Sequence, residues 1–203
     1  MDDQPLARPT SATPRGQARG HILQTAHDLF YRHGIRATGV DTVIAAAGVS
    51  KVTFYRHFPS KDTLVMAYLA YRHARWMAWF QASLARHGGT VEALWQTLGA
   101  WCRDPAYRGC AFINVVGELG DSLPEAVALA RQHKDEVIDV ITGLLPASPQ
   151  RRAQALTLTL LMEGAIVQAQ MGLSWRRMAP ALKQAGAALC AGDAGVGATG
   201  GTA

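Results

Sequence analysis

Apolar residues recur at helical spacing along most of the chain. Ile22, Leu23, Ala26, Leu29 and Phe30 fall at positions i, i+1, i+4, i+7 and i+8, which is one face of a helix. No segment alternates apolar and polar residues as a half-buried strand does. The pattern predicts an all-α protein with about nine helices. The expected ranges are 17–33, 42–47, 51–57, 61–86, 90–103, 109–119, 122–146, 148–171 and 174–190.

Residues at the predicted ends of these helices suit caps and stops. Gly34 ends the first helix, because glycine readily adopts the left-handed conformation of a C-cap. Asp41, Ser50 and Thr90 are placed to accept hydrogen bonds from the first N–H groups of the helices that follow them. In Ser148-Pro149 a capping residue precedes a proline at the first helical position.

The two ends of the chain lack any hydrophobic period. Residues 1–15 are rich in Pro, Ser, Thr and Arg, and residues 191–203 are rich in Gly, Ala and Thr, so both are expected to be flexible tails. The second tail contains a GxGxxG string at 195–200. We dismiss it as a dinucleotide site, because that motif needs a preceding strand and a following helix.

The most informative segment runs from Val43 to Phe58, where two short helices flank a turn at Gly48. Small apolar residues let such helices approach closely, and the glycine suits the turn, as in a helix-turn-helix. Phe54 and Phe58 lie four residues apart and can anchor the second helix to a core. The opposite surface then presents Lys51, Val52, Thr53, Tyr55, Arg56 and His57.

Charge strengthens this interpretation locally rather than globally. The 203 residues include 20 Lys and Arg and 15 Asp and Glu, a net charge of +5 that permits nucleic-acid binding without requiring it. Between Gly48 and Lys61, however, three residues are positive and none is acidic, which is typical of a phosphate-binding footprint. No apolar run reaches the roughly 18 residues of a membrane span, and no secretory signal is recognisable, so we expect a cytoplasmic protein that does not enter a membrane.

The stretch from about Arg19 to Ala67 resembles the DNA-binding domain of TetR-family transcriptional regulators. The matching string is AGVSKVTFYRHFPSK, residues 47–61, followed by Asp62-Thr63-Leu64. A second string, 108–114 with Glu118, resembles one subset of these regulators. The resemblance implies a flexible tail (1–15), a three-helix DNA-binding domain (16–62), an effector-binding and dimerisation domain (63–190) and a second tail (191–203).

The resemblance also implies residue roles. Gly39 and Val40 stand where the family often has hydroxyl residues, so Thr38 or a backbone N–H is expected to replace one phosphate contact. The residues matching positions that meet the major groove are Lys51, Val52, Thr53 and Arg56. Those matching phosphate-contacting positions are Thr38, Thr42, Tyr55, His57 and Lys61.

Dimerisation is expected because one helix-turn-helix reads only a short half-site, whereas two copies about 34 Å apart read a palindrome. The helix 148–171 is apolar nearly all round, and the last helix carries an apolar stripe. In the family the last two helices form the dimer interface; the alternative is that both are interior to a monomer. Candidate interface residues are Leu161, Trp175, Met178 and Leu182.

Bulky and polar residues in the middle helices predict a cavity for a small organic effector. The alternative is an ordinary core; for His133 in particular we slightly favour a buried hydrogen-bonding role. Glu163 should be paired, because burying a lone carboxylate is costly. The candidate pocket residues are Trp76, Phe80, Trp101, Phe112, Asn114, Glu118, His133 and Met162.

Catalysis and metal binding are poorly supported. Cys110 and His133 could be imagined as nucleophile and base, but nothing in the sequence orients them, and there is no CxxC or HExxH motif. We therefore expect no enzyme activity, no metal and no cofactor. The expected function is a dimeric repressor that binds double-stranded operator DNA and is released by an effector; the alternatives are an activator, or a regulator that senses oxidation through Cys110.

Overall fold

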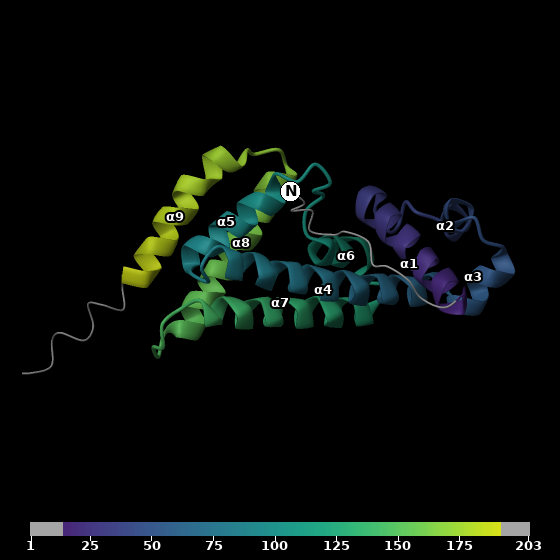
Figure 1. The fold of residues 1–203 in the computed structure, drawn as a ribbon, viewed down its shortest axis with the longest axis horizontal. Coiled ribbons are helices and arrows are strands. Elements are labelled where there is room, and N and C mark those ends of the chain that lie inside the picture. The colour runs from purple at the N-terminus through teal and green to yellow at the C-terminus, as the bar shows by residue number, and fades with distance from the viewer. Residues whose placement is uncertain (1–13, 192–203) are drawn as a thin grey trace, which may run out of the picture. The chain divides into compact units, whose positions relative to one another are not determined.

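The computed structural model describes residues 14–191 and contains nine α-helices and no strand within that range. The all-α prediction is therefore confirmed. The predicted tails and the GxGxxG string at 195–200 lie almost wholly outside the described residues. The helices, labelled in Figure 1, are α1 (Pro14–His33), α2 (Val40–Ala47), α3 (Lys51–His57), α4 (Lys61–Arg86), α5 (Val91–Cys102), α6 (Ala111–Leu119), α7 (Pro124–Gly143), α8 (Arg151–Gln170) and α9 (Trp175–Ala191).

The chain folds into two compact units. Within the described residues, unit 1 contains 14–77 and 110–133, and unit 2 contains 78–109 and 134–191. Unit 1 thus combines α1, α2 and α3 with most of α4, with α6 and with the first half of α7. Unit 2 contains the rest of α4 and α7 together with α5, α8 and α9.

The core of unit 1 forms where α2 and α3 pack against α1. Phe54, Phe58 and Leu64 are fully buried, as the spacing of the two phenylalanines predicted. Gly48 adopts a φ of +61°, and its N–H reaches the Ala45 carbonyl at 3.2 Å. The left-handed conformation suits glycine, so the tight turn between α2 and α3 depends on this residue.

In unit 2, a tryptophan of α5 and one of α9 each pack against a glycine of the facing helix. Trp95 on α5 is 1% exposed, and its indole nitrogen lies 2.7 Å from the position that a Cβ on Gly186 of α9 would take. Trp175 of α9 approaches Gly99 of α5 in the same way, at 2.5 Å. These two glycines let α5 and α9 pack closely, and a methyl group at either position would force the helices apart.

Two predicted caps are wrong. The helix α2 begins at Val40 after Gly39, so Asp41 lies inside its first turn instead of capping it. The helix α8 begins at Arg151, and Ser148 Oγ has no hydrogen-bond partner among the described residues. Ser50 and Thr90 do cap as predicted, accepting hydrogen bonds from the N–H groups of Thr53 (3.1 Å) and Ala93 (3.3 Å).

Candidate nucleic-acid interface

The outward face of α3 is exposed, as predicted. Val52 is 77% exposed and Tyr55 is 47% exposed, while Lys51 and Arg56 are also exposed. The inward Phe54 is fully buried. An apolar side chain left in water at the centre of this face does nothing for folding, because it removes no apolar surface from water.

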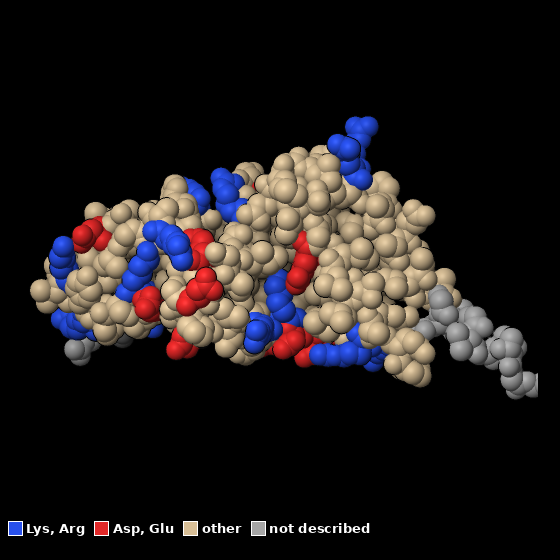
Figure 2. Space-filling view, turned by 180° about the vertical axis from the view of Figure 1, so that it is seen from behind, with Lys and Arg blue, Asp and Glu red and all other residues tan. Residues whose placement is uncertain are grey.

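Basic residues do not cover the surface uniformly. In the face shown in Figure 2, Lys and Arg side chains are interspersed with Asp and Glu. A uniformly basic surface would bind a polyanion in many orientations. Where positive and negative charges are interspersed, the orientation of a bound polyanion depends on contacts with individual side chains.

Lys51 carries an ion pair that the sequence did not reveal. Its Nζ lies 2.9 Å from Asp41 Oδ1, and both side chains are exposed. The hydrogen bond to the Asp41 carboxylate raises the pKa of Lys51. Counting charges only from Gly48 onward missed Asp41, because it belongs to the preceding helix and reaches Lys51 only across the turn.

The side chains of three other predicted DNA-contact residues are exposed to different degrees. Thr42 is exposed on the first turn of α2. Thr53 is half-buried and its hydroxyl lies 3.0 Å from that of Ser50. His57 is also half-buried, and its Nε2 is buried without a hydrogen-bond partner among the described residues.

Thr38 and Lys61 are engaged within the protein. Thr38 is 2% exposed and its hydroxyl donates to the Gly34 carbonyl at 2.7 Å. The ammonium of Lys61 donates to the Ile35 carbonyl at 2.6 Å. Both side chains fix the loop between α1 and α2, and the buried hydroxyl of Thr38 is not accessible to a phosphate.

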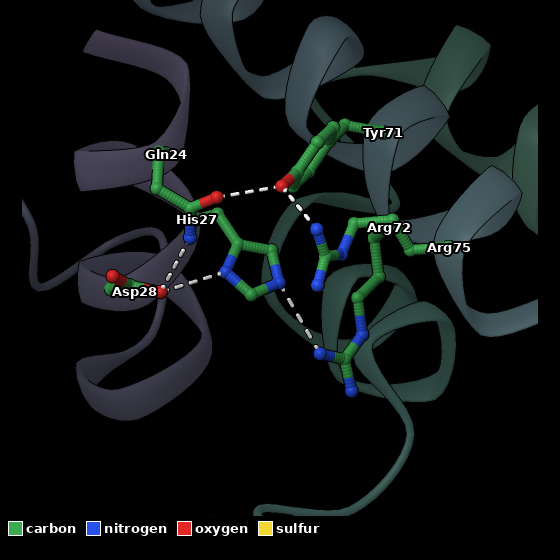
Figure 3. Close-up of polar contacts among 6 residues, drawn as sticks. All are labelled: Gln24, His27, Asp28, Tyr71, Arg72 and Arg75. Atoms are coloured by element: carbon green, nitrogen blue, oxygen red, sulfur yellow. Dashed lines mark hydrogen bonds and ion pairs between the residues drawn. The ribbon is translucent and has the colours of Figure 1, made fainter. Parts of the chain in front are cut away.

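A polar network joins α1 to α4 within unit 1 (Figure 3). Arg72 is 1% exposed, and its Nη1 lies 3.3 Å from His27 Nε2. Its guanidinium also lies 3.9 Å from the ring centroid of Tyr31. His27 Nδ1 lies 2.9 Å from Asp28 Oδ1. Burial lowers the pKa of His27, and the Arg72 charge adds to that lowering.

Further hydrogen bonds extend this network along the two helices. Tyr71 donates to Gln24 Oε1 at 2.6 Å, and Arg75 donates to the Tyr71 hydroxyl at 2.8 Å. The amide of Gln24 donates to Asp28 Oδ1 at 3.0 Å. Sequence reasoning missed the network, because the helical period marks Arg72 only as a polar residue among apolar neighbours.

Three predicted pocket residues come together in unit 1, but as a packed cluster. The rings of Phe112 and His133 stack with centroids 3.8 Å apart, and Trp76 meets His133 edge-on at 5.2 Å. His133 Nδ1 lies 3.1 Å from His73 Nδ1, and His133 is 2% exposed. The hydrogen-bonded histidine that the sequence slightly favoured is what the structure contains.

Two more predicted pocket residues, Asn114 and Glu118, lie on α6. Asn114 is half-buried. Glu118 Oε2 accepts a hydrogen bond from the N–H of Arg36 at 2.8 Å, within the loop that joins α1 to α2. Glu118 therefore contacts the helix-turn-helix part of unit 1, a role that sequence reasoning missed because the two residues are 82 positions apart.

In unit 2, Phe80, Trp101 and Met162 are buried. Glu163 is paired, as expected, with Lys134 at 3.0 Å. An open pocket of about 320 Å³ lies between α5 and α9, and none of the predicted pocket residues lines it. Its walls are formed by Thr90, Val91, Glu92, Trp95, Leu144, Lys183, Gly186, Ala187 and Cys190.

The residues predicted for a dimer interface are mostly covered within one protomer. Met178 and Leu182 are 7% and 6% exposed, and Trp175 packs on Gly99. Leu161 is half-buried. The exposed large apolar residues of α8 and its C-cap are instead Leu156, Leu160, Val167 and Met171, at 46%, 60%, 37% and 67%.

The described residues contain no group of three or more His, Cys, Asp or Glu side chains arranged to hold a metal ion. Among the same residues, no helix combines the length and apolar character needed to cross a membrane.

Comparison with known proteins agrees with this geometry. Residues 22–68, which include α2, α3 and most of α1, match the model of a family described as bacterial regulatory proteins, tetR family. The transcriptional activator FasR of Mycolicibacterium smegmatis is 43% identical over 56 residues, which are 28% of this chain and 26% of FasR. The transcriptional repressor NemR of Escherichia coli is 25% identical over 179 residues, covering 81% of this chain and 89% of NemR.

Solved structures share the fold over nearly the whole chain. A TetR-family transcriptional regulator from Streptomyces coelicolor superposes with a TM-score of 0.75 at 24% identity, covering 90% of this chain and 96% of that one. The reduced form of Escherichia coli NemR gives a TM-score of 0.71 at 23% identity, covering 83% and 95%. These structures establish the arrangement of an N-terminal helix-turn-helix followed by a helical C-terminal part.

Proposed function

Because this chain is a helix-turn-helix transcriptional regulator of the TetR family, we propose that it binds a palindromic operator as a homodimer. It acts in the cytoplasm, represses transcription and is released from DNA by a small organic effector. The observation that carries the proposal is the exposed outer face of α3. Val52 at 77% exposure suits contact with a thymine methyl group, and Arg56 suits a bidentate contact with guanine.

The proposed DNA surface combines base-reading and phosphate-binding side chains. Lys51, Val52, Thr53 and Arg56 are assigned to the major groove, while Thr42, Tyr55 and His57 are assigned to phosphates. Phosphate contacts set the register and base contacts set the sequence preference. Lys61 stays a weaker candidate for phosphate, because its ammonium already donates to the Ile35 carbonyl.

The stripe on α8 supports the dimer. Leu156, Leu160, Val167 and Met171 follow one another at steps of 4, 7 and 4 residues, so they share one face of the helix. An exposed apolar stripe of this kind is typical of an interface between subunits. We therefore assign the dimer contact to this α8 stripe, and a second copy of the chain is the proposed occupant.

The effector is proposed to bind in unit 2. The buried Phe80, Trp101 and Met162 of unit 2 offer apolar walls, and the open pocket between α5 and α9 lies at the lower end of the roughly 300–1,000 Å³ that small-molecule sites occupy. For release from DNA, the effector must bind one conformation of the protein better than the other.

Selection of bound DNA from a random pool tests the proposal directly. A palindrome with half-sites about one or more helical turns apart is the expected result, and failure to enrich any sequence would exclude the DNA-binding function. Leu160→Glu should yield monomers in sedimentation and lose the palindrome. Gln168→Glu adds the same charge to an exposed position of α8 outside the stripe and should stay dimeric.

One alternative is activation, which is favoured by the similarity of residues in the DNA-binding part to FasR, an activator by name. A reporter gene behind the selected operator separates the two, because a repressor lowers expression when the protein is present. The other alternative is redox sensing through Cys110. This thiol is only 4% exposed, which argues for slow reaction with oxidants.

A further inference from the structure

Residues 34–39 join α1 to α2. The backbone of the first half of this connection, the Gly34–Arg36 loop, is held by Glu118 of α6, by Lys61 of α4 and by the nearby Thr38. The Arg36 N–H donates to Glu118 Oε2 at 2.8 Å. The Ile35 carbonyl accepts from the Lys61 ammonium at 2.6 Å, and the Gly34 carbonyl accepts from the Thr38 hydroxyl at 2.7 Å. A loop with all these groups engaged has little freedom to move independently of its partners.

Glu118 makes more than one contact with this loop. Besides the hydrogen bond from the Arg36 N–H, its backbone carbonyl, near the C-terminal end of α6, accepts from Arg36 Nε. Gly34 has a φ of +87°, and a Cβ there would lie 3.2 Å from Glu118 Oε2. The Glu118 carboxylate therefore lies directly against Gly34, and any larger residue at position 34 would crowd it.

The contact links two parts of the chain that the sequence had placed in different domains. The helix α6 was expected in the effector-binding domain, yet it belongs to unit 1 together with α2 and α3. Residues 37–39 connect this loop to α2, and the Gly48 turn connects α2 to α3. Because Glu118 and Arg36 are hydrogen-bonded, we expect a displacement of α6 to reach the loop and, through it, α2.

We propose that Glu118 is a positioning residue that fixes the helix-turn-helix onto α6 through the Gly34–Arg36 loop and so determines the placement of α3 on the operator. The proposal rests on the proposed DNA-binding function and deepens it. It also removes Glu118 from the effector-binding residues, because the carboxylate is used in contacts with the loop.

Charge and position make opposite predictions for a Glu118 variant. Removing a negative charge from a DNA-binding protein strengthens binding in general, since fewer repulsions oppose the phosphates. Loss of a positioning contact instead weakens binding to the operator while leaving binding to random DNA unchanged. The sign of the effect therefore distinguishes the two, and Asp121→Asn is the matched control, because Asp121 is exposed and lies three residues beyond Glu118.

The test measures affinity for the selected operator, for random DNA, and for operators whose half-site spacing is changed by one base pair. Glu118→Ala should bind the operator roughly ten-fold more weakly, as expected for loss of one charge-assisted hydrogen bond, and should discriminate less between spacings. Glu118→Gln keeps an acceptor for the Arg36 N–H and should recover most of the affinity. Asp121→Asn should bind like the original protein or slightly more tightly.

Amide hydrogen exchange provides a readout that needs no DNA. The Arg36 amide should be protected in the original protein and in Asp121→Asn, and should exchange faster in Glu118→Ala while the amides of α7 stay unchanged. If Glu118→Ala does not fold, the exchange of the Arg36 amide in the original protein decides, and fast exchange of that amide would overturn the proposal. Equal Arg36 exchange and equal operator affinity in Glu118→Ala and Asp121→Asn would overturn the proposal. Failure of the original protein to select DNA would overturn only the proposed function, and the exchange experiment would still decide the role of Glu118.

Discussion

Arg72 donates from Nη1 to Nε2 of His27 across 3.3 Å, and both side chains are buried. The acceptor role of Nε2 requires the ring to carry its proton on Nδ1, where it faces Asp28 Oδ1 at 2.9 Å. A doubly protonated ring would direct a second N–H and a positive charge at the guanidinium. The network between α1 and α4 is therefore built for neutral His27.

The first prediction concerns pH. Burial, followed by the charge of Arg72, lowers the pKa of His27 below its ordinary 6.5, so the unfolded chain binds a proton more readily than the folded one. The stabilisation from neutral His27 is complete above pH 6.5 and is lost as the pH falls through the folded-state pKa, with a slope of at most about 1.4 kcal/mol per pH unit. Urea unfolding of the original protein and of His27→Gln between pH 7.5 and 5 measures this. Equal pH dependence of the two proteins would show that His27 is not the group responsible.

Arg72 itself provides the second prediction. Arg72→Met fills similar space but leaves His27 Nε2 without its donor and removes the stacking on Tyr31. Loss of a buried hydrogen bond to a charged group should destabilise the protein by about 2 kcal/mol. Arg72→Lys should recover little of this, because an ammonium lacks the planar face that stacks on the ring. The measurement is urea unfolding monitored by tryptophan fluorescence, and full recovery in the lysine variant would contradict the stacking.

The third prediction concerns the ion pair between Asp41 and Lys51. Asp41→Asn releases the Lys51 ammonium for phosphate contact and removes a negative charge from the DNA surface. Operator affinity should rise. The slope of log affinity against log salt concentration should become steeper by up to the amount that about one phosphate contact contributes. Asp62→Asn removes the same charge from the exposed first turn of α4 and serves as the control. An equal gain in both variants would mean that net charge alone is responsible.

The fourth prediction concerns thiol reactivity and decides the redox alternative. Cys190 is exposed, whereas Cys110 is buried and burial raises the pKa of Cys102 to about 11. Since the thiolate is the reactive form, Cys190 should react first with a thiol reagent, and the other two slowly. Mass spectrometry after brief labelling identifies the modified residue. Rapid modification of Cys110 accompanied by loss of DNA binding would favour the redox sensor instead of an effector.

Local features of the fold could be predicted from the sequence because their causes are local. The burial of Phe54 and Phe58 follows from helical spacing, and the Ser50 cap and Gly48 turn follow from single-residue chemistry. Asp41 was misassigned because a preferred capping residue two positions too late is indistinguishable in a sequence from a true cap.

The predicted site was less complete wherever a role depends on contacts distant in sequence. Glu118 looked like a pocket residue because a polar side chain on an apolar helix gives no sign of its partner, which is 82 residues away. Met178 and Leu182 fit an interface stripe by spacing, but the same spacing also suits packing within one protomer, where they are buried. Spacing identifies a face of a helix and does not identify what covers it.

The last prediction tests how closely α5 and α9 pack in unit 2. A Cβ on Gly99 would lie 2.5 Å from Trp175, and one on Gly186 would lie 2.7 Å from the Trp95 indole nitrogen. Either Gly→Ala substitution forces a buried or half-buried tryptophan to move, so each should lower the free energy of unfolding by about 1–3 kcal/mol despite the better helix propensity of alanine. Gly20→Ala is the matched control, because a Cβ there meets nothing within 4 Å on an exposed position of α1, and it should raise the free energy of unfolding by up to about 1 kcal/mol. Thermal and urea unfolding of the three variants give the comparison. Stabilisation by Gly99→Ala or Gly186→Ala would mean that α5 and α9 have room to separate at these positions.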